Sequence, residues 1–72
     1  MPRPPQVKAR RLIRALERLG FQIIRQKGSH VQLKKATLLV TVPDHPGDLN
    51  PETLKSILRQ AKISVEELSA EL

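Results

Sequence analysis

Three short segments rich in β-branched and apolar residues follow one another between residues 21 and 42, and only tight turns separate them. They cover residues 21–25, 30–34 and 37–42, and their composition favours β-strands. Connections this short can join antiparallel strands, whereas parallel strands need a crossover of a dozen or more residues. The segments therefore predict a three-stranded antiparallel sheet in which consecutive strands pair.

The second of these segments alternates strictly between polar and apolar residues, which predicts two different faces. Val31 and Leu33 should point to one side of the sheet, because successive side chains of a strand alternate. Helices are expected to cover that apolar side. His30, Gln32 and Lys34 should then lie on the opposite, open face.

Two longer helices are predicted on either side of the strands in sequence. Residues 6–19 carry apolar residues at helical spacing, and Gly20 is suited to the left-handed conformation that ends a helix. The second helix should begin with Asn50 as N-cap and Pro51 in the first turn, and should end near residues 61–62. The first buried stripe is predicted to be Ala9, Leu12, Ile13, Leu16 and either Leu19 or Gly20. The second is predicted to be Leu54, Ile57, Leu58 and Ala61.

Ser64 and Glu67 form a capping box that should open a short last helix, with Leu68 and Leu72 as candidate apolar anchors. The resulting α-β-β-β-α order, followed by this small helix, predicts an α+β fold of two layers with both longer helices on one face of the sheet. Double-stranded RNA-binding domains have the same order. The chain should form a single domain over residues 1–72, in which the proline-rich residues 1–5 are a flexible lead-in.

The sequence contains no cysteine, so neither a disulfide nor a thiolate metal site can stabilise this small domain. Phe21 is its single aromatic residue, which argues against the stacking of single-stranded bases on exposed rings. The N-terminus lacks the apolar segment of a signal peptide, and no apolar run approaches the length of about 20 residues that spans a membrane. These features predict a cytoplasmic protein without a membrane partner.

The positive charge of the chain is concentrated in its first half. The net charge is +5 over residues 1–20, +4 over residues 21–36 and −3 over residues 37–72, which gives +6 in total. Such a basic region is typical of a protein that binds a polyanion, nucleic acid first. The alternative is a solvated charged face with no such partner.

Residues 25–30, Arg-Gln-Lys-Gly-Ser-His, bring basic, flexible and titratable residues together in a predicted turn. Cations in this position can hold a phosphate and stabilise charge that develops on it. A glycine lets the backbone approach a phosphate closely, and a serine adds a hydrogen-bond donor. The residues predicted to bind RNA are Arg25, Lys27, Gly28, Ser29 and Lys34.

His30 is the candidate catalytic residue, because an imidazole can accept or donate a proton near neutral pH. Cleavage of RNA without a metal needs a base that removes the proton of a 2′-hydroxyl, together with cations beside the phosphate. The alternative is a surface histidine that only contacts phosphate or water. Asp44, His45 and Asp48 are expected to shape a turn, and the chain has no phosphate-binding or dinucleotide-binding loop. Neither a metal site nor a cofactor is predicted.

Several short sequences occur here in the order found in one known family. The chain resembles, over about residues 8–68, the HicA toxins of bacterial HicA–HicB toxin–antitoxin pairs. The family signature is Gly-Ser-His, here Gly28-Ser29-His30. The other matching sequences are Leu19-Gly20-Phe21, Val42-Pro43 followed by His45, Thr53-Leu54, and Ile57-Leu58-Arg59-Gln60-Ala61.

The resemblance implies a small protein that cleaves messenger RNA and has a fold like the double-stranded RNA-binding domain. It implies a catalytic role for the histidine of the signature, His30, and a HicB-type antitoxin that binds the toxin and blocks its site. His45 is a recurring position of the family, but no catalytic role is carried over to it. Two residues depart from the family pattern, since Glu52 and Lys62 stand where the family often has glycine. If Lys62 must adopt a left-handed conformation, the cost is about 1 kcal/mol.

The favoured hypothesis is therefore a metal-independent endoribonuclease toxin that acts on messenger RNA. A second hypothesis is a binding module that holds double-stranded RNA or DNA and cuts neither. A third is an interaction protein whose main task is to occupy its antitoxin partner.

Overall fold

The structure, a computed structural model, describes residues 5–72. Apart from Pro5, the proline-rich lead-in predicted for residues 1–5 lies outside the described residues. The order of the elements confirms the predicted α-β-β-β-α order with a short last helix. These elements are α1 (Ala9–Arg18), β1 (Gln22–Lys27), β2 (His30–Lys35), β3 (Leu38–Pro43), α2 (Pro51–Ala61) and α3 (Val65–Ala70).

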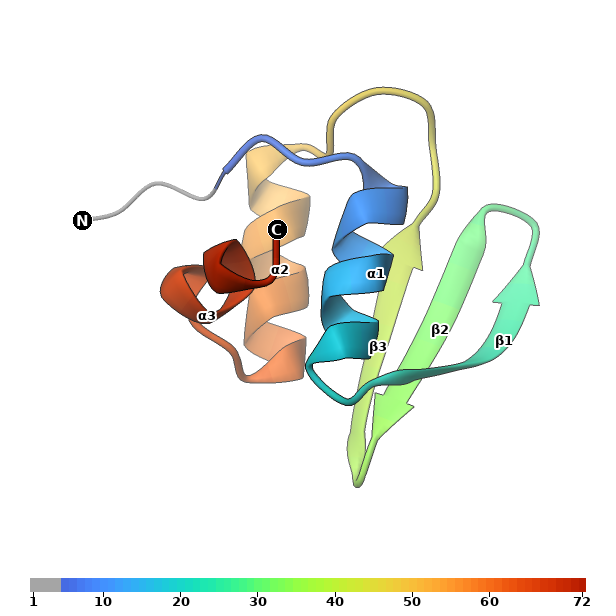
Figure 1. The fold of residues 1–72 in the computed structure, drawn as a ribbon. Coiled ribbons are helices and arrows are strands. Elements are labelled where there is room, and N and C mark those ends of the chain that lie inside the picture. The colour runs from blue at the N-terminus through green and yellow to red at the C-terminus, as the bar shows by residue number, and fades with distance from the viewer. Residues whose placement is uncertain (1–4) are drawn as a thin grey trace.

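The three strands form one antiparallel sheet in the order β1-β2-β3, and α1 and α2 lie side by side over one of its faces (Figure 1). α3 lies beside these two helices, on the side away from the sheet. This is the predicted two-layer α+β fold, which is like that of double-stranded RNA-binding domains. Within residues 5–72, no helix is both long enough and apolar enough to cross a membrane.

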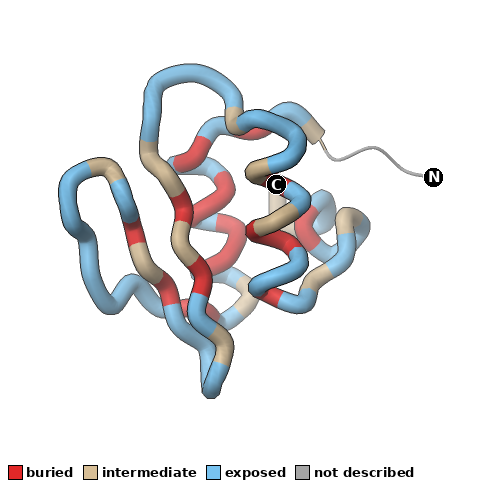
Figure 2. Tube along the Cα trace, turned by 180° about the vertical axis from the view of Figure 1, so that it is seen from behind, coloured by how far each residue is buried: buried red, intermediate tan, exposed pale blue. Residues whose placement is uncertain are grey.

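The core lies between the sheet and the helices, as the alternation in β2 predicts. Val31 and Leu33 are buried, whereas His30 and Lys34 on the same strand are exposed. Figure 2 shows buried residues along β2, β3 and the helices. The two predicted helical stripes supply most of the remaining core, except that Leu19 is only partly buried. The fully buried large side chains are Phe21, Leu12, Leu16, Leu33, Leu54, Ile57, Leu68, Val40 and Val42.

β3, predicted as the centre of the sheet or a well-covered edge, is an edge strand partly covered by α2. The side-chain oxygen of Gln60 accepts a hydrogen bond from the main-chain N–H of Thr41 at 3.4 Å. Pairing an edge N–H in this way removes one of the free groups that an edge strand offers to other chains. β1, the opposite edge, is exposed at every residue.

α1 begins at Ala9, three residues later than the predicted start at residue 6. The preceding residues are engaged elsewhere, since the main-chain carbonyl of Val7 accepts a hydrogen bond from Leu49 at 2.9 Å and Lys8 forms a β-bridge with Asp48. Contacts with the loop after β3 therefore replace the first predicted helical turn. The exit of the helix is as predicted, with Gly20 at a φ of 102°.

The caps of the last two helices also follow the prediction. The Asn50 side chain accepts a hydrogen bond from the Glu52 N–H at 2.8 Å, so an acid in the first turn of α2 coexists with a normal cap. Lys62 ends α2 in the left-handed conformation, at φ 55° and ψ 42°. Ser64 and Glu67 form the capping box of α3 through two hydrogen bonds of 3.0 Å.

Candidate functional site

A β-bulge in β1 sets the direction of its basic side chains. Ile23 pairs with Leu33 and Arg25 pairs with Gln32, so Ile24 is the extra residue between them. Ile23 lies on the helix side of the sheet, and strict alternation would turn Arg25 to that side as well. Because a bulge adds one residue, Arg25 lies on the outer face, which is the face away from the helices.

The turn between β1 and β2 consists of Gly28 and Ser29, and it closes directly on the pair Lys27 and His30. Gly28 has a φ of 58°, which glycine adopts without steric cost at the first position of a two-residue hairpin loop. A Cβ atom at this position would meet no atom within 4 Å. The backbone angle, rather than crowding, therefore favours glycine here, and the space beside the turn is open.

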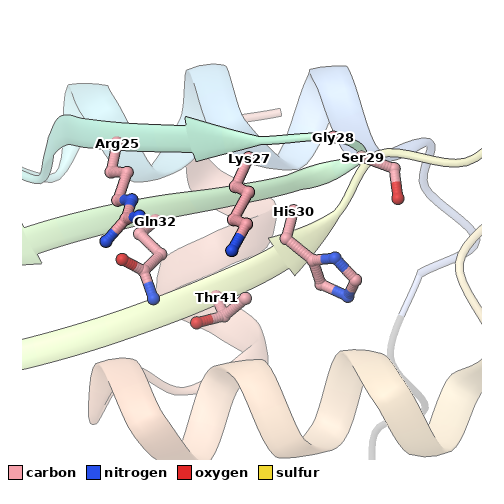
Figure 3. A pocket seen from close by; sticks show the side chains of 7 residues that line it. All are labelled: Arg25, Lys27, Gly28, Ser29, His30, Gln32 and Thr41. Atoms are coloured by element: carbon pink, nitrogen blue, oxygen red, sulfur yellow. The ribbon is translucent and has the colours of Figure 1, made fainter.

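A pocket of about 620 Å³ occupies the outer face of the sheet beside this turn (Figure 3). Two rows of paired residues cross it, one from Arg25 through Gln32 to Thr41 and the other from Lys27 to His30. In Figure 3 these side chains project from the same side of the sheet. The lining residues are Arg25, Lys27, Gly28, Ser29, His30, Gln32 and Thr41.

The pocket is suited to an anion. Two of its lining residues, Arg25 and Lys27, carry a positive charge and none carries a negative one. The remaining polar groups, an imidazole, two hydroxyls and an amide, all include a hydrogen-bond donor. Phosphate groups are bound by such combinations of a guanidinium, an ammonium and neutral donors.

Three of the four arginines of α1 contact other parts of the fold. Arg10 forms an ion pair with Asp44 at 3.3 Å. Arg11 and Arg18 donate hydrogen bonds to the main-chain carbonyls of the last two residues, at 3.2 and 2.9 Å. Three of the cations that make the first twenty residues basic thus also fasten the loop after β3 and the end of the chain.

Five of the six residues predicted for the site line the pocket, and Lys34 does not. Lys34 is exposed on the outer face, but it lies farther from the turn, where it pairs with Gln22 and Leu39. Gln32 and Thr41 line the pocket although neither was predicted as a site residue. The alternation in β2 predicts that Gln32 lies on the open face. Thr41 lines the pocket because the register between β2 and β3 pairs it with Gln32, and the sequence contains no direct signal for that register.

His45 lies close to the pocket without lining it. The centroids of the His30 and His45 rings are 6.4 Å apart, and the ring planes are inclined by 82°. Asp44 and Asp48 share its loop, but residues 5–72 contain no group of three or more His, Cys, Asp or Glu side chains placed to hold one metal ion. Two imidazoles beside a basic pocket are the groups that this site offers for proton transfer.

Fold and site together define a small α+β protein that presents a histidine and cations on the open face of an antiparallel sheet. The sequence model of one protein family, described as the HicA toxin of bacterial toxin–antitoxin, matches residues 9–63. The chain therefore belongs to the HicA toxin family. No curated protein matched the chain.

The match is somewhat shorter than the resemblance over residues 8–68, and α3 lies beyond it. It contains all three strands, both longer helices and every lining residue of the pocket. Membership of the family makes the protein a toxin of a toxin–antitoxin system, which has an antitoxin as its partner.

Proposed function

We propose that the protein is an endoribonuclease that cleaves messenger RNA in the cytoplasm without a metal ion, with His30 as a catalytic residue. The observation that carries this proposal is the position of His30 in a pocket that is lined by two cations and by no acid. The chain belongs to a toxin family, and this supports an activity that harms the cell. Cleavage of messenger RNA would inhibit translation and so account for the toxicity.

In the proposed reaction the 2′-hydroxyl of the RNA attacks the adjacent phosphorus. His30 removes the proton of that hydroxyl, the bond between the 2′-oxygen and phosphorus forms, and the bond to the 5′-oxygen breaks. Once the leaving 5′-oxygen has taken up a proton, the products are a 2′,3′-cyclic phosphate and a free 5′-hydroxyl. Proton transfer by a well-placed imidazole contributes about 10²- to 10⁴-fold to such a reaction.

Arg25 and Lys27 are proposed to hold the phosphate and to stabilise the negative charge of the transition state. Lys27 is the cross-strand neighbour of His30, so its ammonium would lie beside the reacting group. Ser29 would act as a donor near the turn, and Gly28 would leave room for the RNA backbone. Lys34 would contact the RNA outside the pocket.

The proposal is tested with purified protein and a labelled single-stranded RNA in excess EDTA. We expect cleavage, with 2′,3′-cyclic phosphate and 5′-hydroxyl ends on the products. A DNA strand of the same sequence should remain intact because it has no 2′-hydroxyl. RNA that binds the protein but stays full length after long incubation would instead support a binding module.

Replacing Lys27 with alanine should weaken the interaction with phosphate. We expect a higher apparent KM and a salt dependence whose logarithmic slope is reduced by about 0.7, the value for one contact to single-stranded nucleic acid. The measurement is cleavage at several salt concentrations. Lys55→Ala is the matched control, since Lys55 is an exposed lysine on α2, which belongs to the helical layer. Equal changes in both variants would indicate a general charge effect and contradict the proposed contact.

The proposed partner is an antitoxin of the HicB type. Its binding over the outer face of the sheet would block access of RNA to His30. This part of the proposal rests on the family of the chain.

A further inference from the structure

One imidazole is insufficient for the proposed reaction. The attacking and leaving oxygens of a phosphoryl transfer lie roughly in line on opposite sides of phosphorus. A histidine beside the attacking 2′-hydroxyl is therefore poorly placed to protonate the departing 5′-oxygen in the same step. A second donor is needed on the far side of the phosphate.

His45 is the second imidazole of the chain, and the fold brings it next to the first. The two residues are fifteen positions apart, one at the start of β2 and one in the loop that follows β3. Their ring centroids are 6.4 Å apart. At this separation each ring can form a hydrogen bond with a different oxygen of one phosphodiester group.

The position of His45 is fixed by contacts at both ends of its loop. The main-chain N–H of Asp44 donates a hydrogen bond to the carbonyl of Ser29 at 2.6 Å, which ties the residue before His45 to the turn before His30. The Asp44 carboxylate also forms the ion pair with Arg10. Farther along, the hydrogen bond from Leu49 to Val7 holds the loop against the start of α1. Together these contacts hold the loop that carries His45 beside the turn that precedes His30.

We propose that His45 is the general acid of the RNA cleavage reaction and that His30 is the general base. His30 takes the proton of the 2′-hydroxyl, and the imidazolium of His45 gives its proton to the 5′-oxygen as the bond between phosphorus and that oxygen breaks. His30 takes up one proton and His45 releases one, so the reaction needs no further reactant. This inference rests on the proposed ribonuclease function and adds the residue that completes its proton transfers.

The test uses two RNA substrates that differ in one atom. In the second substrate, sulfur replaces the bridging 5′-oxygen at the position that the wild-type protein cuts. A thiol is much more acidic than an alcohol, so the thiolate departs without protonation and needs no general acid. Loss of the acid should therefore slow cleavage of the oxygen substrate and spare the sulfur substrate.

We expect His45→Ala to cleave the oxygen substrate about 10²- to 10⁴-fold more slowly than wild type and the sulfur substrate at nearly the wild-type rate. His30→Ala should be slow on both substrates. His45→Gln keeps a polar side chain but cannot donate a proton in this way, so it should behave like His45→Ala. Pro46→Ala changes the same loop next to His45 and should retain the wild-type rates.

Each other outcome has a distinct meaning. Equal slowing of both substrates by His45→Ala would assign the residue to loop structure or RNA binding and overturn the inference. Unchanged cleavage of the oxygen substrate by this variant would overturn it too, while the proposed function stands. If the sulfur substrate restored fast cleavage to His30→Ala and not to His45→Ala, His30 would be the general acid and His45 the general base. A wild-type protein that cleaves neither substrate would refute the ribonuclease function itself.

Discussion

Replacing His30 with alanine is expected to lower the rate of RNA cleavage by about 10²- to 10⁴-fold. The fold should remain intact, because His30 is exposed on the outer face of β2 and does not belong to the core. The rate is measured under single-turnover conditions, and the fold by circular dichroism and thermal unfolding. Growth inhibition in cells that express the variant should be lost together with the cleavage.

A second substitution at the same position separates proton transfer from simple contact. His30→Gln keeps a side chain that forms hydrogen bonds with phosphate but does not exchange protons near neutral pH, so the same loss of rate is expected. If a purified His30→Ala variant, free of host nucleases, cleaves RNA at the wild-type rate, His30 is not catalytic. The binding-module hypothesis or another catalytic residue would then have to explain the toxin.

Replacing Leu33 with alanine is expected to lower the free energy of unfolding by about 2–5 kcal/mol. Leu33 has no exposed surface, and it belongs to β2, the only strand that pairs on both sides within the described sheet. Domains of ordinary size are stable by about 5–15 kcal/mol, and a 72-residue chain is small for a domain. Urea or thermal unfolding should therefore show a marked fall in stability, with part of the population unfolded.

Leu39 provides the matched control for this substitution. It lies on the neighbouring strand β3, and it is 50% exposed. Leu39→Ala should change the free energy of unfolding by about 0.5 kcal/mol or less, as is usual for surface substitutions. Equal losses in the two variants would contradict the assignment of the core to the helix side of the sheet.

Local patterns in the sequence are sufficient to predict most of this fold. The alternation around Val31 and Leu33 predicts which face of β2 is buried, because side-chain direction follows from the strand itself. The capping residues Asn50 and Ser64 mark the starts of their helices, since the partners of both are two or three residues away. Such features depend on near neighbours only, and all of them are confirmed.

The predictions that differ from the structure involve contacts between distant residues. The first helical turn was predicted from residue 6, but Val7 and Lys8 are bound to residues at least forty positions away. Their own side chains carry no sign of those partners. Thr41 joins the pocket for a similar reason, because its position depends on the register between β2 and β3.

The extent of β1 and its bulge are a further case. Residues 21–25 were predicted as the strand, whereas β1 extends from Gln22 to Lys27 and contains a bulge. Composition favours a strand here but does not say where an extra residue will be left unpaired. The proximity of His45 to His30 likewise depends on a loop conformation that the sequence does not specify.

The extra residue in β1 also bears on how this chain can vary in length. β1 has a single neighbouring strand in the described sheet, so one pairing alone has to accommodate the insertion. A chain without Ile24 could keep the present pairs on either side of that position, and its cations would still face outward. An insertion inside β2 would disturb the pairing on both sides and could exchange Val31 with His30 between the two faces. A change of length should therefore be tolerated more easily in β1, which carries Arg25 and Lys27, than in β2, which carries His30.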